Sequence, residues 1–303
     1  MMGRRKALPS GLFATMLRRF GVVAQETEAH LESRSGAGVH AVRTADGLAA
    51  YLKITPAGSG PRAQMIARRE LSFYQDLAPA APVRTPGLLD YADTEDGVAM
   101  LLEAAGEPLP VASWTPDMWA VLGRELAALH SMPPPVDPSW IRPDGLRQAI
   151  ASPDLPAIEA FWGQFLPRLA EILTQRAELE RQMETLPQVF VHGDCHTDNI
   201  MRLRESLVFL DWQTSGVGRP GSDLTFLSVR ATPAGVTVPP ELLNSYLGGR
   251  PAERRTLELA LLAEELAVYI LQWPAFAAYN SAAGIDRVRR RTQSLAERWL
   301  DGS

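Results

Sequence analysis

Short apolar runs separated by turn-forming residues fill the N-terminal third of the chain. Such runs, bounded by Gly, Ser or Asp, are typical of β-strands. Asp46-Gly47 lies between two of them and favours a tight hairpin turn. A helical pattern over residues 11–20 comes before the runs, and another over residues 62–77 interrupts them. Strands are expected at residues 26–32, 39–44, 48–54, 87–91 and 98–102.

From residue 116 onward, apolar positions recur at the spacing of helices. The segment after Glu103 contains Gly106 and two prolines, which is typical of a hinge. The pattern therefore predicts an α+β chain, with a smaller lobe built on an antiparallel sheet over residues 1–104 and a larger, mainly helical lobe over residues 105–303. Helices are expected at residues 116–130, at 155–186 with a break at Pro167, from about 222, at 240–247, at 252–279 with a kink at Pro274, and at 285–300.

Composition narrows the class of protein. With 303 residues, 46% of them hydrophobic, the chain can bury one large core or two smaller ones. No apolar run approaches the roughly 18 to 20 residues that span a bilayer, and no signal segment follows the basic start, so a soluble cytoplasmic protein is expected. The net charge of −5 disfavours nucleic acid and anionic membranes as partners and favours cationic ligands. The single cysteine, Cys195, excludes an internal disulfide and is expected to be a small buried hydrophobe.

The segment with the clearest chemistry begins where a short β-branched run ends, at Val191. A polar loop follows, with Asp194 and Asn199, and a second apolar run then presents Asp211. The spacing H-x-D-x-x-x-x-N, followed by an Asp after the next strand, matches the catalytic loop of protein kinases, with Gly193 in place of the usual Arg. In that scheme Asp194 receives the proton of the substrate hydroxyl, while Asn199 and Asp211 hold the Mg²⁺ ions that bridge the nucleotide phosphates.

Polar residues in and after this loop form a recognisable set: His192-Gly-Asp194, His196, Asn199, Asp211-Trp-Gln and Gly221-Ser-Asp223-Leu. The set resembles the aminoglycoside phosphotransferase and choline kinase-like family, and the resemblance extends over nearly the whole chain. It implies a bilobal protein-kinase-like fold, with ATP or GTP as phosphoryl donor and Mg²⁺ as cofactor. It also implies that His192 and His196 support the loop, and that Asp223 steadies it through backbone hydrogen bonds. The local pattern also allows Asp223 to cap the helix that begins there.

Lys53 is a cation within a strand pattern whose neighbours are apolar. It is either a surface lysine that keeps its ammonium in water, or the kinase lysine that contacts the α and β phosphates and is held by a glutamate on the next helix. Glu70, in the helical pattern over residues 62–77, is the predicted partner.

Two further segments are candidates for binding the nucleotide. Ser35 and Gly36 lie in a Ser- and Gly-rich turn whose N–H groups can cover phosphates, and an ordinary hairpin turn is the alternative. The family resemblance implies that the hinge backbone binds the base, which makes Glu103 and Ala105 candidates.

Two other classes of protein fit parts of this pattern. In an extended segment, alternating His and Asp side chains at residues 192–198 would face one side, as in a metallohydrolase. The chain has only five histidines, none after His196, and carboxylate and amide ligands suit Mg²⁺ better than Zn²⁺. A catalytically silent nucleotide-binding module would be expected to lack one of four residues, all of which are present: Lys53, Asp194, Asn199 and Asp211.

The acceptor is expected to bind on the C-terminal helices, which supply Glu264, Glu265, Trp273 and Tyr279. Their carboxylates suit ammonium groups, and their aromatic rings suit sugars or cations. Alternatively, the glutamates form a solvated face and the aromatics pack the core. Gly193 stands where the choline kinases have Asn, which favours the antibiotic and sugar-kinase branches. The expected acceptor is a hydroxyl of an aminoglycoside-like antibiotic, inactivated by phosphorylation; the alternative is a metabolic kinase of the choline, homoserine, thiosugar or fructosamine type.

Overall fold

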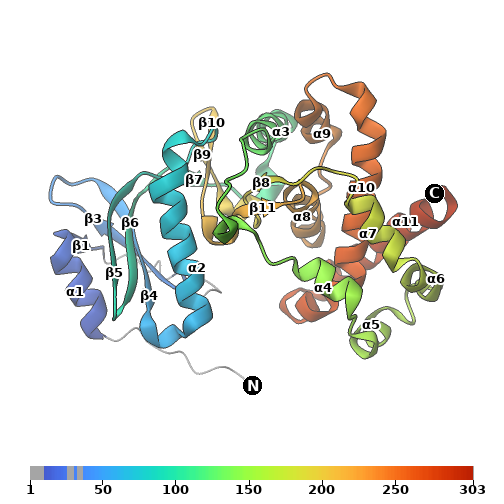
Figure 1. Cartoon of the computed structure of the whole chain (residues 1–303), viewed down its shortest axis with the longest axis horizontal. Helices are drawn as coiled ribbons and strands as arrows, with labels where there is room; N and C mark the ends of the chain where they lie inside the picture. Colours follow the sequence, from blue (N-terminus) through green and yellow to red (C-terminus); the bar gives the residue numbers. More distant parts are fainter. Residues whose placement is uncertain (1–9, 26–30, 33–36, 303) are drawn as a thin grey trace. The chain divides into compact units, whose positions relative to one another are not determined.

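The computed structural model describes residues 10–25, 31–32 and 37–302. The chain divides into two compact units, whose helices and strands are labelled in Figure 1. The first unit contains the described residues up to Gly106 together with Val208–Thr214. The second contains Glu107–Leu207 and the described residues from Ser215 on. Asp211 therefore belongs to the β-rich unit, although it lies far along the chain from the strands of that unit.

The first unit is built on an antiparallel sheet, as the sequence predicts. Asp46-Gly47 connects two of its strands, and Gly47 has a φ of 86°, which glycine adopts readily because it has no Cβ. The strands run in the order β1 (Val23–Ala24), β3 (Gly38–Arg43), β4 (Ala49–Pro56), β6 (Gly97–Glu103) and β5 (Leu88–Thr94), and β2 (Leu31–Glu32) pairs with β3.

Two helices, α1 (Ser10–Phe20) and α2 (Pro61–Ser72), cover opposite faces of this sheet (Figure 1). Leu52 and Ile54 of β4 are fully buried in a cluster that includes Met16 of α1. Lys53 lies between them, and because successive residues of a strand point to opposite faces, its side chain meets Glu70 of α2. Helix α2 continues into a wider π-type turn, Phe73–Leu77, so the helix predicted over residues 62–77 is present.

In the second unit, α3 (Pro116–His130) packs against α9 (Pro240–Leu247), and both helices lie where the sequence predicts them. Gly123 makes this close approach possible. A Cβ at this position would lie 2.2 Å from the carbonyl oxygen of Leu242 and 3.0 Å from the amide nitrogen of Tyr246. Both distances are shorter than van der Waals contact, so no other residue fits without separating the helices.

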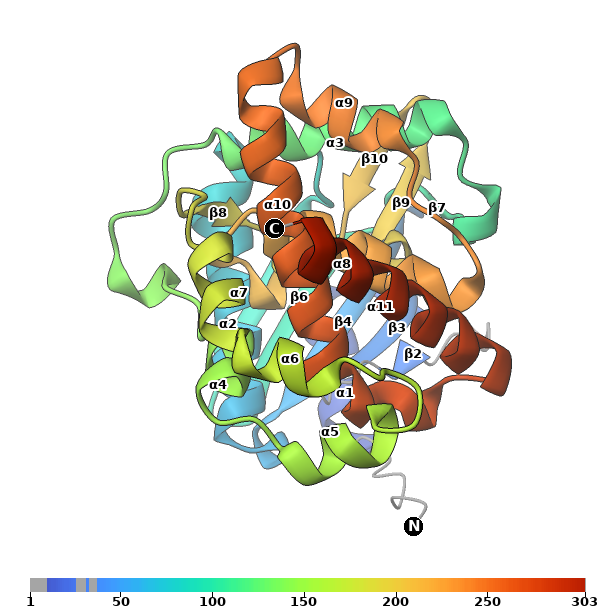
Figure 2. The same cartoon turned by 90° about the vertical axis from the view of Figure 1, so that its right-hand side faces the viewer.

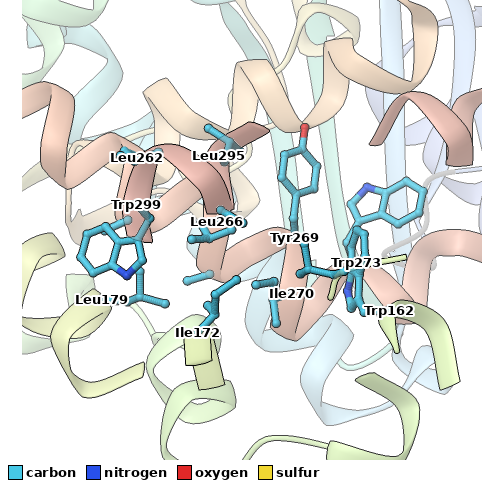
Figure 3. Packing of buried hydrophobic residues seen from close by; sticks show 14 of the residues in the cluster. Trp162, Ile172, Leu179, Leu262, Leu266, Tyr269, Ile270, Trp273, Leu295 and Trp299 are labelled. Carbon is cyan, nitrogen blue, oxygen red and sulfur yellow. The ribbon is translucent and has the colours of Figure 1, made fainter. Parts of the chain in front are cut away.

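The other helices of the second unit surround α10 (Arg254–Ala267) and the turns that continue it, Val268–Gln272 and Trp273–Tyr279. Helices α7 and α11 lie on either side of α10 (Figure 2), and the core between them contains several large aromatic side chains (Figure 3). The surrounding helices are α4 (Gly145–Ala151), α5 (Leu155–Trp162), α6 (Leu169–Thr174), α7 (Arg176–Met183), α8 (Gly221–Ala231) and α11 (Ala282–Gly302).

The helical region predicted over residues 155–186 has two breaks, whereas the sequence predicts one. The first lies around Pro167, as expected, and the second at Gln175, between α6 and α7. The indole nitrogen of Trp299 in α11 donates to the side-chain oxygen of Gln175 over 2.8 Å. A tertiary contact thus accompanies the second break, which local sequence signals do not reveal.

The stretch Arg254–Tyr279 meets the length and composition of a membrane-spanning helix. However, 56% of its most apolar window is buried inside the protein. Leu262, Leu266 and Ile270 of this stretch lie in the helical core shown in Figure 3.

Short paired strands position the polar loop over residues 192–199. Strand β8 (Val189–Val191) leads into the loop and pairs with β11 (Gly216–Gly218). Strand β9 (Ile200–Leu203) leads out of it and pairs with β7 (Glu107–Pro108). The chain then continues through β10 (Ser206–Phe209) towards Asp211. The loop therefore has a paired strand at each end.

Candidate active site

The loop over residues 192–199, called the catalytic loop below, is anchored by one buried carboxylate. The backbone N–H groups of His192 and Gly193 donate to Asp223 Oδ2 and Oδ1 over 2.8 and 2.7 Å. Gly193 has a φ of 83°, a backbone conformation that residues with a Cβ rarely adopt. Asp223 lies in the first turn of α8, and its carboxylate bonds to the loop, as the family resemblance implies, rather than capping the helix.

Asp223 is itself held by a buried histidine. His130, at the end of α3, places Nε2 3.1 Å from Asp223 Oδ2 and Nδ1 2.9 Å from the hydroxyl of Tyr246 in α9. Burial alone would raise the pKa of Asp223, but His130, His192 and the Gly193 N–H outweigh it and keep this pKa below its usual value. The packed pair α3 and α9 is thereby connected to the catalytic loop.

Asp194, near the start of the catalytic loop, and Asn199, at its end, lie close together. The side-chain amide of Asn199 donates to the Asp194 carbonyl oxygen over 3.0 Å and to Asp194 Oδ2 over 3.1 Å. The backbone N–H of Asn199 donates to the His196 carbonyl oxygen over 2.9 Å and closes a tight turn. One predicted metal ligand thus fixes the orientation of the predicted catalytic base.

His196 lies between two carboxylates of the same loop, 3.7 Å from Asp194 Oδ2 and 3.5 Å from Asp198 Oδ2. Burial disfavours its charged form, but the two carboxylates outweigh burial and raise the pKa of His196. Cys195 is fully buried, and burial together with the nearby charges of Asp223 and Asp194 raises the pKa of its thiol well above the usual value. The expectation that Cys195 packs as a small hydrophobe is therefore confirmed.

In the first unit, the predicted pairing of Lys53 with Glu70 is present. The ammonium of Lys53 lies 2.6 Å from Glu70 Oε2 and 2.6 Å from Asp211 Oδ1. Burial disfavours the charged form of Lys53, but the two carboxylates outweigh it, and the net effect is to raise the pKa of Lys53. Lys53 thus remains a cation although it is buried. It lies on the strand where the kinase pattern places the phosphate-binding lysine.

The segment that carries Asp211 is fixed by packing within the first unit. The ring of Trp212 stacks on Phe73, with ring centroids 3.9 Å apart, and its indole nitrogen donates to the Phe209 carbonyl oxygen over 2.9 Å. Asp211 has a φ of 62°, which is rare for a residue with a side chain. Gln213 donates to Asp211 Oδ2 over 3.0 Å. A strained backbone of this kind is concentrated at functional sites.

The other predicted nucleotide contacts are not tested by the structure. Ser35 and Gly36 lie outside the described residues. Glu103 ends β6, and its carboxylate accepts a hydrogen bond from the Gly87 N–H over 3.2 Å. Ala105 is buried shortly after it. Binding of the nucleotide base by this segment stays a prediction.

A cavity of about 200 Å³ lies within the second unit, directly beside the catalytic loop. Gly193 of the loop and Glu264 of α10 are among the residues that line it. The other three predicted acceptor residues do not line it: Glu265 bonds to Arg291 and Ser228, Trp273 is buried in the helical core, and Tyr279 is 73% exposed.

The cavity wall contains charged residues that the sequence patterns did not single out. Arg219 forms a two-pronged contact with Asp144 and places Nη2 3.3 Å from Glu264 Oε1. Arg142 extends from the irregular segment before α4 and donates to the Gly193 carbonyl oxygen over 3.2 Å. Neither arginine lies in a helical or strand pattern. The one local sequence signal for either of them is weak, namely the Arg-Pro-Gly turn that begins at Arg219.

A model of the phosphotransferase enzyme family matches residues 33–259. The chain belongs to this family. The chemistry of this phosphotransferase is therefore phosphoryl transfer, and the metallohydrolase and silent-module alternatives receive no support. No curated protein matches the chain significantly.

Solved structures show the fold of this phosphotransferase. Choline kinase from Cryptosporidium parvum matches with a TM-score of 0.64 at 13% identity, covering 96% of each chain. Amicoumacin kinase, solved with AMP-PNP and Ca²⁺, matches with a TM-score of 0.60 at 15% identity, covering 95% of this chain and 94% of that one. Macrolide 2′-phosphotransferase from Brachybacterium faecium matches with a TM-score of 0.54 at 21% identity, covering 94% and 97%. The predicted protein-kinase-like fold is thus confirmed.

Proposed function

We propose that the protein transfers the γ-phosphoryl group of ATP to a hydroxyl group of a small molecule. The observation that carries this proposal is the anchored catalytic loop, in which Asp223 accepts the two N–H groups directly before Asp194. A general base must be held in place to act, and this contact holds the backbone that presents it. As the acceptor oxygen bonds to the γ phosphorus, the bond from that phosphorus to ADP breaks, and the acceptor proton passes to Asp194.

The charged groups of the first unit have a role in the same reaction. Lys53 is held by Glu70 and Asp211, and we assign to its ammonium the orientation of the nucleotide phosphates. This assignment predicts that Lys53→Ala raises the KM for nucleotide and lowers kcat, because one contact serves both binding and transfer.

Asp211 and Asn199 are the residues that we propose to hold Mg²⁺. Carboxylate and amide oxygens are hard ligands of the kind that Mg²⁺ prefers. Magnesium, when bound, neutralises charge on the phosphates. The amicoumacin kinase structure, which contains a divalent cation with an ATP analogue, supports the use of a metal in this fold. Excess EDTA should abolish activity, and full activity in EDTA would refute the metal assignment.

For the acceptor, we propose an amine-bearing natural product of the aminoglycoside-like antibiotic class, inactivated by phosphorylation. The support is Gly193 before the catalytic aspartate, the net charge of −5, and the antibiotic kinases among the similar structures. A metabolic kinase of a small sugar or amino alcohol is the second candidate. The cavity of about 200 Å³ favours it, because pockets for drug-sized ligands measure roughly 300 to 1,000 Å³. For either acceptor we propose a cytoplasmic enzyme without a nucleic-acid or membrane partner.

One screen tests the proposal and separates the two acceptors. The purified protein is incubated with Mg²⁺ and ATP or GTP against antibiotics, amino sugars and metabolite alcohols, and ADP or GDP release and product mass are measured. Asp194→Ala is the control for contaminating kinases. A product one phosphate heavier, absent with Asp194→Ala, is expected. If no compound is phosphorylated with either nucleotide, the proposed function is refuted.

A further inference from the structure

The cavity in the second unit lies within reach of the proposed base. Gly193, directly before Asp194, lines it, and so does Phe226. The ring of Phe226 stands edge-on to His196, with centroids 6.0 Å apart, and His196 lies 3.7 Å from Asp194. Only the side chains of Phe226 and His196 therefore separate a ligand in this cavity from the proposed catalytic carboxylate along this path.

The two carboxylates in the cavity wall are already occupied. Arg219 contacts both Asp144 and Glu264. Burial alone would raise the pKa of Asp144, but Arg219 outweighs it and holds this pKa below its usual value. The second oxygen of Glu264 packs against Gly221, where a Cβ would lie only 1.9 Å from it. Both carboxylates are thus engaged by Arg219, and Glu264 Oε2 remains buried without a hydrogen-bond donor among the described residues.

Arg142, in contrast, has no carboxylate in direct contact, and Asp223, Asp144 and Glu264 attract its charge from further away. Among the residues that the structure describes, no carboxylate oxygen lies within 4.0 Å of its guanidinium, whose two hydrogen bonds go to the hydroxyl of Ser222 over 3.1 Å and to the Gly193 carbonyl oxygen over 3.2 Å. A guanidinium has about five N–H donors, so most of them remain for a ligand. Gly218 makes room for this group, since a Cβ there would lie 3.0 Å from Arg142 Nη1.

Two more donors in the wall lack a protein acceptor. The hydroxyl of Thr225 and the Nε–H of Arg219 are buried, and neither has a hydrogen-bond partner among the described residues. Buried polar groups of this kind are costly unless a ligand or water satisfies them. The wall therefore offers several N–H and O–H donors without a protein acceptor, while its two arginines and two carboxylates balance in formal charge.

We propose that this cavity binds a carboxylate group of the acceptor, with Arg142 as its main partner and Thr225 as a second. A planar guanidinium matches the two oxygens of a carboxylate, and the volume of about 200 Å³ suits a small hydroxy acid. The identity of the occupant as acceptor rests on the proposed phosphotransferase function, and a hydroxy acid belongs with its second candidate, a small metabolic acceptor, rather than with an aminoglycoside-like antibiotic. Because Arg142 also donates to the Gly193 carbonyl oxygen, an occupied cavity fixes the residue before Asp194, which makes Arg142 a positioning residue as well.

Binding without nucleotide tests the subsite directly. Calorimetry compares acids with their matched amides, namely L-serine with L-serinamide and 4-hydroxybutyrate with 4-hydroxybutyramide. The wild type is expected to bind at least one acid about 10- to 100-fold more tightly than its amide, the range for a charge-assisted contact. Arg142→Gln should remove this preference, Arg142→Lys should keep part of it, and Thr225→Val should weaken acid binding about 5-fold.

Arg147→Gln is the matched control, since Arg147 lies on α4, is 60% exposed at its side chain, pairs with Glu180 and does not line the cavity. It should keep the full preference for the acids. Equal affinity for acids and amides, no detectable acid binding, or an undiminished preference in Arg142→Gln would overturn the subsite. These outcomes are separate from failure of the proposed function, because calorimetry without nucleotide requires no turnover. Acid binding without phosphorylation of any compound would refute the function alone.

Discussion

The catalytic loop and the cavity beside it are held in place by different kinds of contact. In the loop, two backbone N–H groups donate to the buried carboxylate of Asp223. In the cavity wall, side chains hold side chains, and Arg219 connects Asp144 with Glu264. A backbone hydrogen bond does not depend on the donor's side chain, whereas an ion pair changes with either residue. Apart from Arg142, which donates to the Gly193 carbonyl oxygen, the residues of the cavity wall can therefore be altered one at a time while the loop keeps its geometry.

The largest effect is expected from removing the charge of Asp194. Asp194→Asn should lower kcat by at least ~10²-fold, the lower end of general-base contributions, and leave nucleotide affinity unchanged. Acid binding in the cavity should also be unchanged, because Asp194 does not line it. Product formation and nucleotide titration measure both effects. Asp198→Asn is the matched control, since Asp198 lies in the same loop with a side chain that is 68% exposed. Near-normal turnover of Asp194→Asn would exclude its role as base.

This contrast between loop and cavity explains what the sequence could predict. Spacing within motifs predicts the loop residues, the strand before them and the pairing of Lys53 with Glu70. The strand and the ion pair are both present in the structure. The hydrogen bonds from the loop backbone to Asp223 follow from the family resemblance rather than from spacing.

The cavity could not be predicted in the same way, because distant segments build its wall. Glu264 and Glu265 are neighbours on α10, yet only Glu264 lines the cavity, while Glu265 pairs with Arg291. Successive helical residues point in different directions, and an unaligned sequence does not reveal which one faces the site. Arg142 lies in an irregular segment without a pattern, so its meeting with Gly193 emerges only from the tertiary fold.

Breaking the ion pairs of the cavity wall is expected to cost stability. Arg219→Leu leaves Glu264 buried without its cationic partner, and loss of one member of a buried pair costs about 3 to 5 kcal/mol. The free energy of unfolding, measured with urea, should fall by the lower part of this range, because Asp144 is partly exposed. Adding Glu264→Gln to Arg219→Leu should restore part of the loss, since the amide carries no charge. A double variant as unstable as the sum of the two single variants would contradict this account.

Weakening the anchor of the loop should have a smaller effect that appears mainly in turnover. Asp223→Asn keeps one acceptor oxygen but removes the charge, so one of the two backbone N–H groups loses its bond. A hydrogen bond to a charged group contributes roughly 1.5 to 3 kcal/mol, which predicts a decrease in kcat of about 10- to 100-fold. Nucleotide affinity and acid binding should stay within about 3-fold of the wild type. Equal losses in kcat and in acid binding would show that loop and cavity are not independently held.

The smallest expected effect is a pH dependence of the free energy of unfolding that arises from His196 in the catalytic loop. Nearby Asp194 and Asp198 outweigh burial and raise the pKa of His196 above its ordinary value of 6.5. A histidine with a raised pKa in the folded state contributes stability that is fully present below the unfolded pKa and is lost as pH rises through the folded pKa. The wild type should therefore lose stability relative to His196→Gln between pH 6 and pH 8.5, by less than about 1 kcal/mol, since Asp198 is largely exposed. Urea unfolding at both pH values measures the difference, and Asp198→Asn should reduce it. Parallel pH profiles of wild type and His196→Gln would show that these carboxylates do not stabilise the imidazolium.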